Sequence, residues 1–180
     1  LLLIAKKNYS FISYRNYKQS GKVILWRHDL DLSVHRAYQL SVIEKQVGVN
    51  ATYFLDIHSK YYNIFEKEVY DLVRGILLNG HEVGLHFDPS FYSITAENVE
   101  LLQSYVNRES RLLESFFGTK INALSFHNPE IGGFTEFSAL HLNNLVNAYS
   151  SYLQHNYSYV SDSNGYWRFR RLYDVLEEGK

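Results

Sequence analysis

Two carboxylates one residue apart, Asp29 and Asp31, follow an apolar run of strand-forming residues at positions 23–26. A buried parallel strand holds the residues at its carboxyl end in fixed positions, and α/β folds bind ligands at that edge of the sheet. The pair therefore indicates a metal ligand beside a catalytic base, with His28 lining the same cleft. A charged turn, in which Asp31 or Ser33 caps the next helix, is the alternative for this segment taken alone.

Two further strand-like segments end in groups that bind metals. The segment at 80–88 ends in His86 and Asp88, and the segment that begins at 123 ends at His127. Imidazole and carboxylate suit zinc and similar divalent ions, and an open catalytic site needs about three protein ligands plus water. Because the chain contains no cysteine, thiolate ligands are excluded. The three segments together predict a divalent metal site, which we expect to hold Zn²⁺, with Co²⁺, Mn²⁺ and Fe²⁺ as alternatives.

The order of five motifs resembles the polysaccharide deacetylases of the NodB-homology type, which are similar to carbohydrate esterase family 4. The motifs are RHDLD at 27–31, ATYFL at 51–55, GHEVGLH at 80–86, FHNP at 126–129 and SDS at 161–163. The resemblance extends over nearly the whole chain and is greatest to an uncharacterised bacterial branch with an Arg-His-Asp-x-Asp motif, often associated with surface-polysaccharide clusters. It implies a deformed (β/α) barrel and metal-dependent hydrolysis of an N-acetyl or O-acetyl group on a sugar or polysaccharide.

The resemblance also assigns roles to the first metal-site residues. Asp29 falls where the family has its catalytic base. The metal-binding Asp of the family comes directly afterwards, where this chain has Leu30, so the role passes to Asp31. His86 matches the first histidine of the His-x-x-x-His metal motif, but the second would fall at Ser90. One imidazole ligand is therefore missing and another group must replace it.

Three residues are candidates for that third ligand. His127 ranks first, because it falls where the third motif of the family has an Arg close to the catalytic Asp. His81 lies five residues before His86, and in a strand an odd spacing places two side chains on opposite faces, which favours a supporting role. Asp88 shares a face with His86 if the strand continues, although Pro89 indicates that the chain already turns there.

The resemblance places further residues around the substrate. Asp162 matches the Asp of the fourth motif, which orients neighbouring catalytic groups, and Trp167 corresponds to the aromatic residue of that motif. We expect His28, Asn128 and Trp167 to contact the sugar. Taken alone, the residues around Asp162 form an ordinary polar turn. The family takes its general acid from a histidine on a late strand, and no matching motif occurs in this sequence.

Length and composition fit one domain over residues 1–180, since 46% hydrophobic residues suffice for one sizeable core. The sequence starts at Leu1, contains no Met and stops within a helix-like segment at 176–180. We therefore expect a fragment truncated at both ends, without the last strand or strands of the barrel.

Charge and hydropathy limit the partners. A net charge of −1 gives no attraction to nucleic acid or to an anionic membrane. The apolar start at 1–5 is too short to span a membrane, and no signal peptide is visible. We expect a cytoplasmic protein whose partner is a carbohydrate.

Strand and helix patterns alternate along the chain, which predicts a parallel sheet independently of any family. We expect helices at 33–47, 61–78 and 95–117, and strands at 50–57, around His86 and before His127. The region 132–158, rich in Asn, Tyr and Ser, is expected to form loops with short helices.

An inactive relative is the alternative function. A carbohydrate-binding domain, or an assembly protein of a polysaccharide-synthesis system, would tolerate the loss of one metal histidine and of the general acid. Metal binding distinguishes the two, because the hydrolase needs an ion and the binding protein does not.

Overall fold

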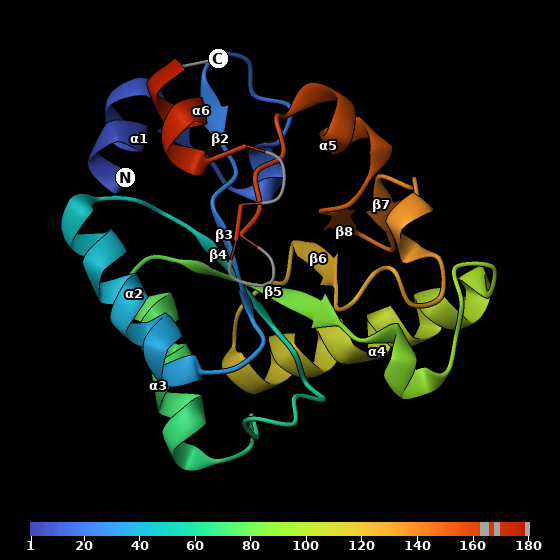
Figure 1. The fold of residues 1–180 in the computed structure, drawn as a ribbon. Helices are drawn as coiled ribbons and strands as arrows, with labels where there is room; N and C mark the ends of the chain where they lie inside the picture. Colours follow the sequence, from blue (N-terminus) through green and yellow to red (C-terminus); the bar gives the residue numbers. More distant parts are fainter. Residues whose placement is uncertain (163–165, 168–169, 179–180) are drawn as a thin grey trace.

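The computed structural model describes residues 1–162, 166–167 and 170–178. They form a mixed α/β fold with a mostly parallel sheet (Figure 1). The helices are α1 (Leu2–Asn8), α2 (Val34–Val47), α3 (Lys67–Leu78), α4 (Val99–Phe117), α5 (Ser151–Asn156) and α6 (Leu172–Glu178), with short 3-10 turns η1 (Tyr14–Asn16), η2 (Pro89–Tyr92) and η3 (Phe134–Glu136). The strands are β1 (Ser10–Phe11), β2 (Val23–Ile24), β3 (Arg27–Leu30), β4 (Thr52–Leu55), β5 (Glu82–Phe87), β6 (Ala123–Phe126), β7 (His141–Leu142) and β8 (Leu145–Asn147).

The main sheet has the strand order β3-β4-β5-β6-β8-β7, and all neighbours are parallel except β7 and β8. A separate parallel pair joins β1 to β2. Within the described residues β3 and β7 are the edge strands of the main sheet, so the closed barrel implied by the resemblance stays a prediction. In the same part of the chain, no helix has the length and apolar character needed to cross a membrane.

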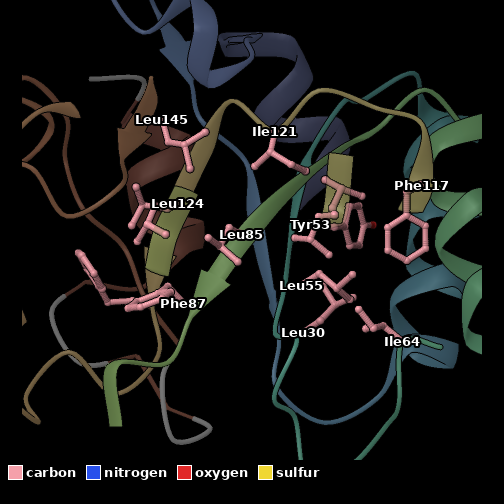
Figure 2. Close-up of a cluster of buried hydrophobic side chains, with 14 of the residues drawn as sticks. Leu30, Tyr53, Leu55, Ile64, Leu85, Phe87, Phe117, Ile121, Leu124 and Leu145 are labelled. Carbon is pink, nitrogen blue, oxygen red and sulfur yellow. The ribbon is translucent and has the colours of Figure 1, made fainter. Parts of the chain in front are cut away.

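The strands β4, β5 and β6 are buried on both faces, as expected for the centre of a parallel sheet. One face of the sheet packs against α2, α3 and α4 (Figure 1). These helices follow β3, β4 and β5 in the chain, respectively. Figure 2 shows the resulting core, a single cluster that contains the sheet residues Leu30, Tyr53, Leu55 and Leu85 together with Phe117 of α4. The polar residues at the carboxyl edge therefore lie on the face of the sheet that these helices do not cover.

Several element boundaries differ from the sequence predictions. The first strand of the main sheet is β3 itself, so the charged residues at 27–29 lie inside a strand and not after one. The predicted helix at 61–78 begins only at Lys67, because the Asn63 side chain accepts a hydrogen bond from Phe65 N and forms a turn. The predicted helix at 95–117 begins at Val99, after a turn in which Asn98 accepts from Thr95.

The region 132–158 contains two strands, β7 and β8, that the sequence did not predict. β8 lies beside β6 and extends the main sheet, with Ala123 paired to Val146. Asn147 at its end is fully buried, and its side-chain amide donates to the carbonyl oxygens of Phe137 and Ala139. A buried polar residue in a three-residue strand hides the alternating pattern that would identify it.

A close approach between strands requires a glycine in β5. A Cβ atom at Gly84 would lie 2.6 Å from the ring of Phe54 on β4 and 3.2 Å from the carbonyl oxygen of Ala123 on β6. The Phe54 ring therefore occupies the space over this glycine, on the face that also carries the polar residues.

On the helical face, the carboxylate of Glu44 joins α2 to the sheet. The side chain is fully buried, and it accepts hydrogen bonds from Trp26 Nε1 at 2.7 Å and Tyr53 OH at 2.6 Å. His28 Nε2 lies 2.7 Å from the same carboxylate. Burial opposes the charged form of Glu44, but these contacts outweigh it and lower its pKa.

Removing this carboxylate should destabilise the fold. We expect Glu44→Ala to lower the free energy of unfolding by about 3 kcal/mol, because it leaves buried donors without an acceptor. Urea denaturation monitored by circular dichroism measures the change. Glu68→Ala is the matched control, since Glu68 pairs with His35 but its side chain is 74% exposed, and it should change stability by less than about 1 kcal/mol. Equal losses in the two variants would show that Glu44 does not stabilise the fold in this way.

Candidate metal centre

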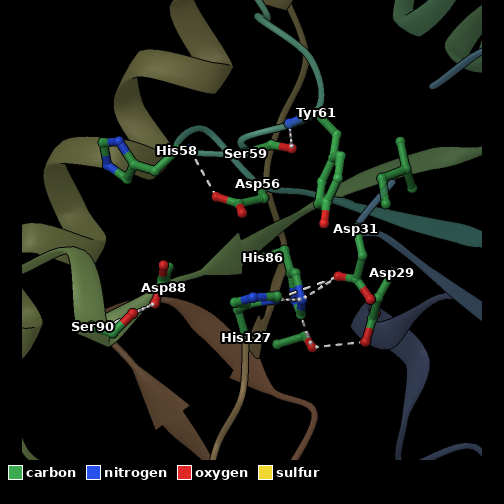
Figure 3. Close-up of polar contacts among 12 residues, drawn as sticks. Asp29, Asp31, Asp56, His58, Ser59, Tyr61, His86, Asp88, Ser90 and His127 are labelled. Atoms are coloured by element: carbon green, nitrogen blue, oxygen red, sulfur yellow. Dashed lines mark hydrogen bonds and ion pairs between the residues drawn. The ribbon is translucent and has the colours of Figure 1, made fainter. Parts of the chain in front are cut away.

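The alternation of side chains along the strands places the polar residues on one face of the sheet. In the register of the sheet, Asp29 lies opposite Phe54, and His86 lies opposite Ser125. His127 follows β6 two residues after Ser125 and so points to the same side. Figure 3 shows Asp29, His86 and His127 converging at the carboxyl edge of the sheet, where Asp31 reaches over from the end of β3.

Asp31, His86 and His127 form a compact group of possible metal ligands, with ligand atoms within 4.8 Å of one another. His86 Nε2 lies 3.1 Å from Asp31 Oδ1, and His127 Nδ1 lies 3.5 Å from the same oxygen. The two ring nitrogens are 3.2 Å apart. In a tetrahedral zinc site with bonds of about 2.0–2.1 Å, neighbouring ligand atoms are about 3.3 Å apart. The three distances therefore fit a divalent ion.

The electrostatics of this group favour an anionic carboxylate. The neighbouring imidazoles of His127 and His86 hold the pKa of Asp31 well below its ordinary range, although burial acts in the opposite direction. The contact with Asp31 raises the pKa of His127 above its ordinary value. The Asp31 side chain is 50% exposed, so the group opens to solvent on that side.

Asp29 lies beside this group and is held through one of its two oxygens. Its Oδ2 accepts from the Arg27 guanidinium and from Ser125 Oγ, the latter at 3.4 Å. Its Oδ1 is buried and has no hydrogen-bond partner in the described part of the chain. Of the two oxygens of Asp29, Oδ1 is therefore the one that the described protein groups do not already hold.

Arg27 is fixed in turn by aromatic rings. Its guanidinium carbon lies 5.0 Å from the centre of the Phe54 ring and 5.3 Å from that of Tyr149. Burial opposes the charge on Arg27, but the neighbouring Asp29 raises its pKa well above the ordinary value. Arg27 therefore stays cationic beside the Asp29 carboxyl group.

Asp56 is a further acidic residue at this edge that the sequence analysis did not single out. It directly follows β4, and it is only 5% exposed (Figure 3). Its Oδ1 accepts from His58 N at 2.8 Å. Burial raises the pKa of Asp56, and the imidazoles of His86 and His127 oppose the rise. Its position after a buried strand is the same signal that identified the other residues.

The residues ranked second as metal ligands make other contacts. His81 is buried on the helical face, where Nδ1 accepts from Ala51 N and Nε2 donates to Ser41 O at 2.9 Å. Asp88 caps the turn η2 by accepting from Ser90 N at 2.9 Å (Figure 3). Neither belongs to the Asp31 group, and both contacts are those of a structural support.

Of the three expected substrate residues, His28 and Trp167 line one cavity, whereas Asn128 is not among its lining residues. His28 lies on the face of β3 opposite to Asp29 and contacts Glu44, because neighbouring residues of a strand point to opposite sides. Asn128 is exposed just beyond His127, with a positive φ of 45° that lets the chain turn there.

Asp162 and Trp167 border the cavity that His28 also lines, which has a volume of about 270 Å³ and whose wall includes Arg27 and Tyr14. Asp162 is not part of the Asp31 group, so its orienting role stays a prediction. Residue 163 of the predicted fourth motif lies outside the described residues.

Two solved structures have a similar fold, whereas no family model and no curated protein matches the chain. One is the deacetylase PplD of Streptococcus pyogenes in complex with acetate, with a TM-score of 0.50, 14% identity and coverage of 69% of this chain. The other is IcaB from Ammonifex degensii, with a TM-score of 0.51, 18% identity and the same coverage. This is the fold of the NodB-type polysaccharide deacetylases. The match spans 58% of the PplD chain and 62% of the IcaB chain, so this chain corresponds to less than two thirds of either.

Proposed function

We propose that the chain is the site-bearing part of a metal-dependent carbohydrate deacetylase, a hydrolase that removes an N- or O-acetyl group from a sugar or polysaccharide. The observation that carries the proposal is the unpartnered Oδ1 of Asp29, next to a carboxylate and two imidazoles with the spacing of metal ligands. The fold shared with the deacetylase PplD, a structure that contains acetate, supports the same reaction class. The proposal also includes a closed (β/α) barrel as the fold and a carbohydrate as the binding partner.

Asp31, His86 and His127 would hold the ion through Oδ1, Nε2 and Nδ1 respectively, the atoms that now face one another. We infer Zn²⁺ as the ion, because one carboxylate and two imidazoles suit it. The chemistry that such an ion supplies is the activation of a water molecule and the polarisation of a carbonyl group.

Asp29 acts as the general base. Its free Oδ1 accepts a proton from the water that attacks the acetyl carbonyl carbon, while Arg27 keeps Oδ2 in place. Asp29 then returns this proton to the sugar nitrogen or oxygen as its bond to the carbonyl carbon breaks. The products are acetic acid, which ionises to acetate at neutral pH, and an amine or a hydroxyl on the sugar.

Metal content and acetate release, measured on the same preparation, test the proposal. After mild chelation and reloading with Zn²⁺, we expect roughly one ion per chain and acetate release from N-acetylglucosamine oligomers or O-acetylated oligosaccharides. Chelation should abolish the release, and Zn²⁺ should restore it. Acetate release that persists without metal would contradict metal dependence, and the absence of both ion and release would contradict the proposed function.

A further inference from the structure

A buried hydroxyl group connects the metal group to the catalytic base. Ser125 on β6 is fully buried, and its Oγ lies 3.2 Å from His86 Nδ1. The same oxygen accepts from Arg27 Nη2 at 2.8 Å and donates to Asp29 Oδ2 at 3.4 Å. Three charged or titratable side chains thus meet at one hydroxyl.

The chemistry of the three partners determines the directions of these hydrogen bonds. A hydroxyl has one hydrogen to donate and two lone pairs to accept with. Arg27 can only donate, so it uses one lone pair, and an ionised Asp29 can only accept, so it takes the hydrogen. The remaining lone pair of Ser125 faces His86 Nδ1, which must therefore carry a hydrogen and donate it.

This assignment has a consequence for the other nitrogen of His86. A neutral imidazole with its hydrogen on Nδ1 has a free lone pair on Nε2. Nε2 is the atom that faces Asp31 Oδ1 and His127 Nδ1. The hydrogen bond to Ser125 thus selects the tautomer in which His86 presents a ligand atom to the metal group, as hydrogen-bond partners of metal-binding histidines do elsewhere.

We propose that Ser125 is a positioning residue that fixes His86 as the Nδ1–H tautomer and thereby sets the affinity of the site for its metal. This inference rests on the proposed function. The same hydroxyl donates to Asp29, so the residue that orients the metal ligand also supports the catalytic base. Arg27 donates to one lone pair of Ser125 Oγ, so only the other lone pair is left to accept the hydrogen of His86 Nδ1.

The dissociation constant for Zn²⁺, measured by competition with a chromophoric chelator, tests this proposal. We expect Ser125→Ala to bind Zn²⁺ about 10- to 100-fold more weakly than the wild-type chain. Ser125→Thr and Ser125→Val form an isosteric pair that differs only in the hydroxyl, so Thr should retain tighter binding than Val by the same factor. Ser110→Ala is the control, because Ser110 is a buried serine on α4 whose hydroxyl donates to Asn107 O, and its affinity should be unchanged.

The tautomer of His86 gives a second readout that a merely structural role would not affect. Long-range ¹H–¹⁵N spectra of the Zn²⁺-loaded wild-type chain should show Nδ1 protonated and Nε2 without hydrogen. Ligation through Nδ1 instead would overturn the proposal, even if none of the variants at position 125 folds.

The outcomes separate this inference from the proposed function. A wild-type chain that binds no Zn²⁺ would overturn both. Zn²⁺ binding that is equal in the wild type and Ser125→Ala, or equal in the Thr and Val variants, would overturn the role of Ser125 alone.

Discussion

Asp29→Asn should slow acetate release about 10²- to 10⁴-fold, the range that a general base contributes. The amide has nearly the shape of the carboxylate but cannot accept a proton from water at neutral pH. Since Oδ1 of Asp29 has no other partner, the variant loses this proton transfer while the Asp31 group stays intact. The measurement is kcat for acetate release by chains that carry the same amount of Zn²⁺.

Asp29→Asn also leaves the buried Arg27 guanidinium without its counter-charge, so we expect it to be less stable than the wild type. The assay must therefore run at a temperature at which circular dichroism shows the variant folded. Asp88→Asn is the matched control, because Asp88 lies at the same edge of the sheet but only caps a turn. Wild-type turnover in Asp29→Asn would refute the base assignment, and an equal loss in Asp88→Asn would attribute the effect to the loss of any nearby carboxylate.

His86→Ala should lose the metal. The His86 side chain is 3% exposed and contacts both other members of the group, so no neighbouring side chain can take its place without a rearrangement of the sheet. We expect affinity for Zn²⁺ to fall by more than the 10- to 100-fold typical of residues that only support a ligand. Elemental analysis after gel filtration, together with chelator competition, measures the loss.

His127→Ala should behave in the same way, since His127 Nδ1 completes the group. His35→Ala is the control, because His35 is an exposed histidine on α2 that pairs only with Glu68 in the described contacts. Stoichiometric Zn²⁺ in His86→Ala would show that the metal binds elsewhere.

The sequence allowed the metal group to be predicted because each of its members lies at or just beyond the carboxyl end of a strand. Such residues can be predicted from the end of each strand alone, since parallel strands bring their carboxyl ends to one edge of the sheet. This rule does not place His28 in the metal group, because His28 is adjacent to Asp29 in sequence and for that reason points to the opposite face; its role as a substrate contact stays a prediction. Adjacency in a strand separates side chains, whereas a spacing of two brings them together.

The supporting residues Arg27 and Ser125 were not predicted as part of the site, although each lies two positions before a predicted site residue. Their role depends on distances across three strands, and no pattern within one strand encodes the register that sets those distances. The helices and strands, like the site residues, were predicted only in part. The boundaries of α2 follow from Ser33 and Gly48, which cap it as the sequence indicates, whereas β8 has no comparable local signal.

The glycine in β5 links packing to reactivity. The Phe54 ring lies across Gly84 on one side and under the Arg27 guanidinium on the other, and Arg27 in turn fixes Asp29. A methyl group at position 84 would have to displace the ring, and with it the cation that holds the base. The position of the proposed base therefore depends in part on the absence of a side chain at Gly84, which lies on a different strand from Asp29.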